Sequence, residues 1–351
     1  MKTKWIGLAV LLLVITGAGL YAAVGRPAEA VEITGFVGGE KIGLLEDEQV
    51  TERMEEKYGL KMDYARAGSL DMITADHSGR NYLFPSSQTA LELYENLYGR
   101  PVKSEIVLNT PIVLYTRKAV ADALTEQGIV SEEDGVLYGD MEKLTQCLED
   151  GTTWEELGLP QLYGSFSVGT TDPNKSNSGN MFAGLLANIL CGGVADESNI
   201  DEALPRLRSI FQKLGYMETS SSDLFDQFLK TGMGAKPLIA GYENQLLEFA
   251  VQNPSDWEQV KDDIVMIYPN PSVWSAHVFI ALDEAGAKGI DALMDEEVQQ
   301  LAWDPHGFRT GVYGTAMDTE KFGVDGVAGE ITRIAPMPDV NTMMKIMDAL
   351  K

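Results

Sequence analysis

The folded part of the chain opens with an alternation of strand and helix patterns. Residues 31–37 alternate apolar with other side chains, residues 46–58 place apolar side chains four positions apart, and residues 60–65 form a second apolar run. The helix is expected to end at Gly59. Strand, helix and strand within about 35 residues have the size of a βαβ unit with parallel strands. Ligands of such sheets collect beyond the carboxyl ends of the strands. The residues expected there are Gly38, Gly39, Gly68 and Ser69.

The same pattern recurs in the next segment of the chain. A short apolar run from residue 81 ends in Ser86 and Ser87, and residues 89–98 predict the following helix. Serine residues before a helix commonly cap it, and capping is the simpler interpretation of each serine taken singly. Together they would also form a second polar set that faces the ligand edge of the sheet.

Two extended runs are too long for ordinary strands of five or six residues. Residues 105–117 contain the sequence Asn109-Thr110-Pro111, which interrupts an otherwise β-rich run, and residues 264–280 contain two prolines. Each run suits a strand that leaves one lobe and enters the other. The pattern therefore predicts an α/β protein with two lobes hinged by two crossing strands, and closure around a ligand is a standard behaviour of that architecture.

The crossings also define the expected domain boundaries. The first lobe would be discontinuous, with residues 31–110 plus 270–351, and the second would contain residues 111–269. Helices are expected at residues 118–127, 141–148, 204–214, 224–229, 244–251, 287–294, 296–302 and 343–350. A strand is expected at residues 236–240, and loops at residues 131–139 and 303–311. The sequence Thr153 to Glu156 has the spacing of a capping box.

The stretch TTDPNKSNSGNMFA, residues 170–183, predicts the end of a strand, a polar turn and the start of a buried helix. Phe166 and Val168 would belong to the strand, and the helix would continue through residues 181–190. The candidate N-caps are Ser176, Asn177 and Ser178. Gly179 would let another group approach the first turn closely. Such a helix start suits an oxyanion or a carboxylate, although an ordinary capped helix is the alternative.

The N-terminus predicts export. Lys2 and Lys4 precede an uncharged run over residues 5–24, and Ala28-Glu29-Ala30 follows. A basic start, an apolar stretch and an A-x-A site are typical of a secretory signal peptide. The run is also about the 20 residues that span a bilayer, so an uncleaved membrane anchor is the alternative. In both cases the protein would work outside the cytoplasmic membrane, and residues 1–30 would not belong to the fold.

Charge excludes some partners. The formal net charge is −26, and it would fall to near −28 without residues 1–30. A surface this acidic repels nucleic acid and anionic lipid, so no nucleic-acid partner is expected. An anionic ligand in a locally positive pocket stays compatible with it. Cys147 and Cys191 are the only cysteines, and we expect two buried thiols in preference to a disulfide.

The sequence shows no catalytic motif. The three histidines, His77, His277 and His306, match no metal-binding spacing. Residues 164–169 approach a nucleophile elbow but carry serine in place of the first glycine. A hydrolase stays a less favoured alternative, because no catalytic set is visible, and we expect a non-enzymatic protein without cofactor or metal.

Several of these motifs, taken in order, resemble those of a known family. GGEKIGLLEDEQV, YARAGSLDM, PIVLYTRKAV, TTWEEL, TDPNKSNSG, GYENQ and IYPNPSVWSAHVFI with GFR resemble extracellular solute-binding proteins of ABC transporters. The layout is similar to the type II periplasmic-binding-protein fold of the molybdate-, sulfate-, iron- and sugar-binding proteins. The resemblance covers residues 31–350 and is not specific for one ligand.

The resemblance implies a ligand held between the lobes. The positions that it assigns to the site are Gly39, Glu40, Lys41, Gly68, Ser69, Ser86, Ser87, Asn177, Ser178, Gly179, Tyr242 and Glu243. The chain departs from the oxyanion binders, which often have serines after the first strand, and from the iron binders, whose paired tyrosines are absent around Tyr242.

The resemblance further implies a monomer that delivers its solute to an ABC permease. A sensor that signals to a membrane partner is the alternative. For the ligand, the helix start near Asn177 and a positive charge on Lys41 favour an oxyanion or a carboxylate. The carboxylates Glu40 and Glu243 would favour a cation or a neutral polyol instead.

Overall fold

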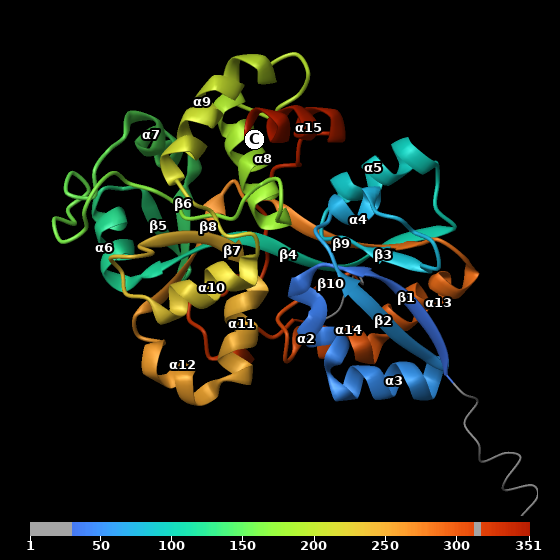
Figure 1. Ribbon diagram of the computed structural model, residues 1–351. Helices are drawn as coiled ribbons and strands as arrows, with labels where there is room; N and C mark the ends of the chain where they lie inside the picture. Colours follow the sequence, from blue (N-terminus) through green and yellow to red (C-terminus); the bar gives the residue numbers. More distant parts are fainter. Residues whose placement is uncertain (1–29, 312–316) are drawn as a thin grey trace, which may run out of the picture.

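The computed structural model describes residues 30–311 and 317–351. Figure 1 shows two α/β lobes side by side, joined by strands that run through both. Except for Ala30, the predicted export segment lies outside the described residues, and it stays a prediction. Within the described ranges, no helix combines the length and the apolar character needed to cross a membrane.

The first lobe contains the predicted βαβ unit. β1 (Val31–Val37) pairs in parallel with β2 (Leu60–Arg66) on one side and with β3 (Tyr82–Phe84) on the other. α3 (Glu48–Tyr58) connects the first two strands and ends at Gly59, whose φ of 58° is in the left-handed region that favours glycine. The carboxyl ends of these strands therefore lie at one edge, as predicted.

Short helices follow these strands. They are η1 (Gly39–Lys41), α2 (Ile42–Glu46) and α4 (Asp71–Thr74), and the longer α5 (Gln88–Tyr98) follows β3. The sequence predicted α5 but none of the short helices. Three to five residues complete little more than one turn, so no helical periodicity of apolar side chains can develop in them.

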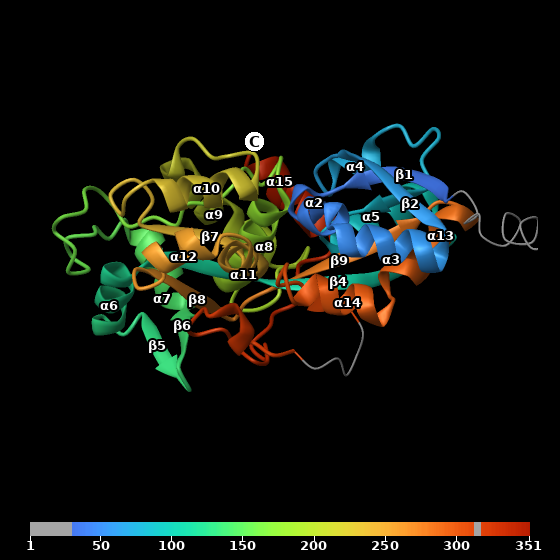
Figure 2. The same cartoon turned by 90° about the horizontal axis from the view of Figure 1, so that it is seen from below.

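The crossing between lobes is made by one long strand. β4 (Lys103–Arg117) has 15 residues. Its first part pairs with β9 (Trp274–Ala281), and its second part pairs with β7 (Leu238–Tyr242) and β8 (Ile264–Asn270). The chain returns through β8 and β9, so the two predicted crossings are confirmed. Figure 2 shows β4 passing from one lobe to the other.

The predicted interruption at Asn109-Thr110-Pro111 is not a break in β4. All three residues pair with β9, and the only irregularity in that pairing is a register shift nearby. The strand order is β2-β1-β3-β9-β4-β8-β6-β5, with β7 and β10 also paired to β4. One mixed sheet thus connects both lobes.

Helices of the second lobe surround its part of the sheet (Figure 1). They are α6 (Lys118–Glu126), α7 (Met141–Asp150), α8 (Asn177–Cys191), α9 (Ile200–Leu214), α10 (Ser221–Lys230), α11 (Glu243–Gln252) and α12 (Pro254–Val260). All but α12 were predicted, with boundaries that differ by a few residues. The predicted capping box also forms, because Thr153 and Glu156 exchange hydrogen bonds between side chains and backbone N–H groups.

The predicted loop at residues 131–139 is wrong. β5 (Val130–Glu133) and β6 (Val136–Asp140) form an antiparallel hairpin instead. Asp134 and Gly135 make its turn with φ values of 51° and 80°, and Asp-Gly is a strong signal for such a turn. The hairpin was missed because most of β5 is polar and exposed, which hides the alternation expected of a strand.

The segment before α8 also differs from expectation. Phe166 and Val168 are buried, but they form no regular strand, and Gly169 makes only an isolated bridge to Ile239. The alternation of apolar and polar side chains here reflects a chain that packs against β7 without a full ladder. Cys147 and Cys191 are free thiols and half-buried, so the expectation of no disulfide is confirmed, whereas full burial is wrong.

The last part of the chain contains α13 (Glu284–Leu293), α14 (Glu296–Trp303), β10 (Arg309–Thr310), η2 (Glu320–Phe322) and α15 (Val340–Ala349). α15 lies against α8 and α9 of the second lobe and also contacts α5 of the first (Figure 1). The division into residues 31–110 plus 270–351 and residues 111–269 stays a proposal, and α15 is a second point of contact between its two parts.

Candidate ligand site between the lobes

A cavity of about 310 Å³ lies where the two lobes face each other. The first lobe contributes the residues that follow β1 and β2, and the second contributes the residues at the N-termini of α8 and α10. Its lining residues are Gly38, Gly39, Glu40, Arg66, Ala67, Gly68, Ser69, Asp71, Lys175, Ser176, Asn177, Thr219, Ser220 and Ser221. The fold thus brings five of the predicted residues together in one cavity: Gly39, Glu40, Gly68, Ser69 and Asn177.

The first-lobe wall follows from the parallel pairing of β1 and β2. Because both strands end at the same edge, the chain after Val37 lies beside the chain after Arg66. Gly39 lies close to Arg66, because a Cβ there would lie 2.5 Å from Arg66 Nε, so a side chain at this position would displace the guanidinium. Ser69 is buried, and its Oγ accepts a hydrogen bond of 2.9 Å from the Ser86 N–H, so the β2 end is fixed to the β3 end.

The second-lobe wall consists of two helix starts. Ser176 is the N-cap of α8, but its side chain makes no capping hydrogen bond and contacts Ser178 Oγ instead. Ser220 is the N-cap of α10 and accepts a hydrogen bond from the Asp223 N–H. The first N–H groups of a helix lack partners within the helix and carry partial positive charge. Two such termini at one cavity favour a negative ligand group.

The lobes touch at the rim of this cavity. Arg66 Nη2 donates a hydrogen bond of 2.7 Å to Ser220 Oγ, and Asn177 Nδ2 donates one of 2.9 Å to the Ser86 carbonyl. A Cβ on Gly68 would lie 3.0 Å from the Lys175 carbonyl oxygen. These contacts describe lobes that are closed against each other on this side.

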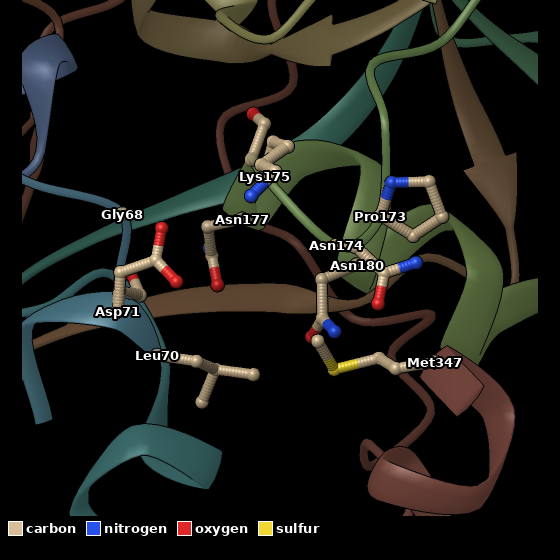
Figure 3. Close-up of a pocket in the computed structure, with 11 residues that line it drawn as sticks. Gly68, Leu70, Asp71, Pro173, Asn174, Lys175, Asn177, Asn180 and Met347 are labelled. Atoms are coloured by element: carbon tan, nitrogen blue, oxygen red, sulfur yellow. The ribbon is translucent and has the colours of Figure 1, made fainter. Parts of the chain in front are cut away.

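A narrow crevice continues from the cavity toward the C-terminal helix (Figure 3). Its volume is about 20 Å³, which is enough for about one water molecule. Asp71 of the first lobe faces Lys175 and Asn177 of the second across this gap, and Met347 of α15 closes its far end beside Asn180. The crevice is too small for a solute, so the larger cavity is the candidate site.

Behind the first-lobe wall lies a buried cluster of charged groups. Lys41 Nζ lies 2.5 Å from Glu40 Oε1, 2.6 Å from Ser86 Oγ and 3.2 Å from His277 Nδ1. Ser86 Oγ in turn donates to Glu40. Lys41 is wholly buried and also lies over the ring of Phe84. Its charge is therefore neutralised locally, and the positive charge predicted at the mouth of the site is not offered to the cavity by Lys41.

Electrostatics of this cluster hold Glu40 ionised. Burial alone would raise the pKa of Glu40, but the Lys41 ammonium and the hydrogen bonds from Lys41 and Ser86 lower it to about 2. Burial lowers the pKa of Lys41, and the adjacent carboxylate opposes that effect. Burial and the neighbouring ammonium also hold the pKa of His277 well below its usual range, so its imidazole is neutral. The cluster is a Glu40–Lys41 ion pair with a neutral histidine beside it.

Asn177 connects this cluster to the second lobe. Besides the Ser86 carbonyl, its Nδ2 reaches the hydroxyl of Tyr242 at 3.0 Å. Its Oδ1 has no hydrogen-bond partner among the described residues. Tyr242 is buried behind Asn177 and does not line the cavity, and burial raises the pKa of its phenol well above the usual range. Asn177 is thus oriented by residues of both lobes.

The remaining predicted positions serve the scaffold. Ser87 caps α5 by accepting from the Ala90 N–H. Ser178 is buried and bonded to Thr171 Oγ1. Gly179 does permit a close approach, but the approaching group is the Thr171 carbonyl, which a Cβ would overlap. None of these three lines the cavity.

Glu243 is likewise occupied elsewhere. Its two carboxylate oxygens accept hydrogen bonds of 2.6 and 2.7 Å from Arg309, and the Tyr268 hydroxyl also donates to it. The pair is buried, and Arg309 further donates to the Ala328 carbonyl. This arrangement uses both oxygens of Glu243 inside the fold, and Glu243 does not line the cavity.

Sequence reasoning missed the charged residues of the cavity. Arg66 and Lys175 lie within YARAGSLDM and TDPNKSNSG and are both exposed, so nothing in their spacing distinguishes them from the other surface lysines and arginines. The lining also contains two carboxylates. Asp71 opposes the positive charges of Arg66 and Lys175, whereas Glu40 is neutralised by its ion pair with Lys41. Thr219, Ser220 and Ser221 reach the cavity only through the packing of α10 against η1. Within residues 30–311 and 317–351, no group of three His, Cys, Asp or Glu side chains could hold a metal ion.

Comparison with solved structures establishes the fold. The ferric binding protein from Campylobacter jejuni matches with a TM-score of 0.59 and 11% identity, over 91% of this chain and 97% of that protein. The sulfate-binding protein from Mycobacterium tuberculosis matches with a TM-score of 0.55 and 13% identity, over 90% and 96%. A periplasmic binding protein from Actinobacillus pleuropneumoniae, solved with fructose-6-phosphate, matches with a TM-score of 0.56 and 14% identity, also over 90% and 96%.

These structures are two-lobed binding proteins, so the predicted type II periplasmic-binding-protein fold is confirmed. No family model and no curated protein matches this chain. At identities this low, the likeness concerns the fold alone. The ligand has to be argued from the cavity.

Proposed function

We propose that this protein is an extracytoplasmic solute-binding protein that holds a small oxyanion or carboxylate between its lobes and delivers it to an ABC-type membrane transporter. The fold, which it shares with binding proteins for ferric ion, sulfate and fructose-6-phosphate, supports a binding and transport role. The single observation that supports an anion is the cavity itself, where the N-termini of α8 and α10 meet beside Arg66 and Lys175.

The positive groups outweigh the negative ones in this cavity. Arg66 donates one of the five guanidinium N–H groups to Ser220, so the others are available to a ligand. Glu40 is already paired with Lys41, which leaves Asp71 as the only uncompensated carboxylate of the lining. Each charge-assisted hydrogen bond to an anion would contribute about 1.5–3 kcal/mol, and each helix terminus about 0.3–2 kcal/mol.

Binding and closure are coupled in this proposal. The cavity is complete only when the end of β2 meets the N-termini of α8 and α10, and β4 with the β8–β9 return would be the hinge. A ligand that contacts both walls stabilises the closed form relative to an open one. The closed form would be presented to the permease, and a monomer suffices because one chain supplies both walls.

The first test identifies the ligand and then removes the positive charges. Native mass spectrometry of the purified protein and a thermal-shift panel of sulfate, phosphate, carboxylates, sugars, amino acids and metals would select a probe. For an anion, Arg66→Gln and Lys175→Gln should each weaken binding roughly 10- to 100-fold, which corresponds to the loss of a charge-assisted hydrogen bond.

Lys61→Gln is the matched control, because Lys61 is exposed on the first lobe and lies outside the cavity. Anion binding that is equally strong in all three variants would contradict the proposal. Gly179→Asp is unsuitable as a test of the helix start, because any side chain there collides with the Thr171 carbonyl and would disturb the fold.

A further inference from the structure

A second cavity of about 340 Å³ lies on the other side of Gly39 and Glu40. Its other walls come from α10 and α11 of the second lobe, and Gly43 of α2 belongs to its first-lobe side. The two cavities are separated where η1 contacts α10: Ser221 lines the first and Ser222 lines the second. The molecule therefore has two distinct spaces between its lobes, and the proposed function uses only one.

Asn244 gives the second cavity an unmet hydrogen-bonding demand. It stands in the first turn of α11, its side chain is wholly buried, and it lines the cavity. Neither Oδ1 nor Nδ2 has a partner among the described residues, although the backbone N–H reaches Thr110 Oγ1 at 3.4 Å. Buried amides are almost always hydrogen-bonded, so a wholly unpartnered one at a cavity wall indicates that something else supplies its partners.

The neighbouring amide shows the contrast. Gln245 is also buried at this cavity, but its Oε1 accepts from the Tyr242 N–H at 2.9 Å and its Nε2 donates to the Ser221 carbonyl at 3.1 Å. Gln245 is thus satisfied by the scaffold and holds α10 against α11. Asn244, one position earlier, has no such role, which separates it from the structural amides of this region.

The charges of the second cavity disfavour an anion. Its lining contains the carboxylates Asp226 and Glu248 and no lysine, arginine or histidine, although Asp226 is paired with Lys230 at 2.9 Å just outside it. Glu248 Oε1 is bonded to His306 Nδ1 at 2.7 Å, which fixes the carboxylate at the wall. Glu40 lies at the boundary and is neutralised by Lys41. The carboxylates accept hydrogen bonds, so the occupant must donate them.

Two classes of molecule donate hydrogen bonds to carboxylates, and Asn244 distinguishes between them. A simple alkylammonium ion has only donors, so it would satisfy Oδ1 and leave Nδ2 unpaired. A hydroxyl group both donates and accepts, so a molecule with several hydroxyls satisfies both amide atoms and the carboxylates. Phe225 and Phe249 add apolar ring surface to the same cavity, on which the C–H face of such a molecule can pack.

We propose that this cavity is a second binding site, for a neutral polyhydroxylated molecule such as a sugar or a polyol, with Asn244 as its central hydrogen-bonding residue. The site is separate from the anion cavity and does not depend on the proposed function. Occupancy of the two sites is expected to be independent in the first instance, since they share only Gly39 and Glu40.

The test uses the full chain with D-glucose, D-ribose and glycerol as neutral probes, ethylammonium as the cationic probe and acetate as the anionic probe. Ligand-observed saturation-transfer NMR, followed by titration, measures each dissociation constant. At least one neutral probe should bind saturably, and Asn244→Leu, which replaces the amide by an apolar group of similar size, should weaken it at least 10-fold. Lys175→Gln should leave the binding of that neutral probe unchanged, because Lys175 lines only the first cavity, which separates this site from the anion cavity.

Three outcomes would overturn the proposal. The first is that no neutral probe binds the parent protein. The second is that ethylammonium binds and the neutral probes do not, which would make this a cation site. The third is that Asn244→Leu folds, as judged by its circular dichroism, and binds the neutral probe as well as the parent does. None of these outcomes bears on the Arg66 and Lys175 variants, so a failure here stays distinguishable from a failure of the anion proposal.

Discussion

The two cavities share the Gly39–Glu40 turn and differ in the charge and the aromatic content of the residues that surround it. The first is lined by Arg66, Lys175 and two helix starts, and the second by carboxylates, amides and phenylalanine rings. Opposite chemistry on two sides of one turn is possible because the Glu40 charge is used internally by Lys41 and Ser86. A residue that lines both spaces therefore contributes charge to neither, and the outer walls decide what each space accepts.

The largest expected effect comes from breaking that internal pair. Glu40→Gln leaves the Lys41 ammonium buried without a counter-ion, and removing one partner of a buried ion pair typically costs about 3–5 kcal/mol. Urea unfolding should show a loss of that size, and binding in both cavities should fall because their common wall is disturbed.

The double variant Glu40→Gln/Lys41→Met is the matched control, because it removes the charge together with its partner. It should lose much less stability than the single variant. If the free energy of unfolding of Glu40→Gln lies within about 1 kcal/mol of that of the parent, a typical value for any point mutation, the ion pair does not stabilise the wall between the two cavities.

The second prediction concerns pH and the same carboxylate. The pKa of Glu40 is about 2 in the folded protein, below the usual value of about 4.3 in an unfolded chain. A lowered folded pKa means that the stabilisation is complete above the unfolded value and is lost as pH falls from about 4.3 toward 2. The difference corresponds to roughly 3 kcal/mol.

Unfolding free energies measured between pH 6 and pH 2.5 would check this. The difference in unfolding free energy between the parent and Glu40→Gln should become smaller as the pH falls, because a protonated Glu40 side chain is uncharged like that of glutamine. A gap that stays constant over this range would show that Glu40 is not the titrating group. Asp295, whose pKa the hydrogen bonds from Arg53, Lys57 and Tyr58 lower despite burial, titrates in both proteins and cancels in the comparison.

The third prediction compares two buried asparagines. Asn188 donates to the Pro336 carbonyl and accepts from the Ala195 N–H, each at 2.8 Å, whereas Asn244 has no side-chain partner among the described residues. Asn188→Leu should therefore destabilise the protein by about 1–3 kcal/mol, and Asn244→Leu should be neutral or stabilising by about 1 kcal/mol. Thermal and urea unfolding without added ligand measure both, and equal losses would show that Asn244 is satisfied within the fold.

The smallest effect sharpens the comparison most directly. Ser220 lines only the first cavity and Ser222 only the second. Each alanine substitution should weaken the binding of a ligand in its own cavity by roughly 2- to 10-fold, which corresponds to the loss of one neutral hydrogen bond. Ser220→Ala should in addition lose about 0.5–2 kcal/mol of stability, because Ser220 caps α10. Crossed effects, in which Ser222→Ala weakens the anion, would mean that the two spaces act as one site.

The sequence alone determined the architecture of this protein. Its strand–helix–strand alternation and its two overlong extended runs predicted the parallel β1–β2–β3 unit and the crossings through β4 and the β8–β9 return. Such patterns are local, because a strand or helix that buries one face has to repeat apolar side chains with its own period. Where that period was hidden, as in the polar hairpin of β5 and β6, the prediction failed.

The residues that line the first cavity were predictable where topology alone places them. Gly39, Glu40, Gly68 and Ser69 follow strands whose carboxyl ends must meet, and Asn177 stands at the start of a helix that faces them. Ser87, Ser178 and Gly179 were chosen for chemistry that serves capping and close packing equally well. A sequence cannot separate these uses, because the same hydroxyl or missing side chain fits both.

Only the tertiary structure decided which charged groups are neutralised inside the fold and which line a cavity. Lys41 and Glu243 look like free ligand-binding groups in the sequence, but Glu40 and Arg309, respectively, neutralise them inside the fold. Arg66 and Lys175 are exposed side chains, but closure of the lobes places both at the lining of one cavity, and the packing of α10 on η1 adds Ser220. The pairing of charges and amides depends on contacts between residues far apart in the chain, such as the 66 positions that separate Glu243 from Arg309. Periodicity and spacing carry no record of such contacts, so only the packing decides which charged and polar groups each cavity presents.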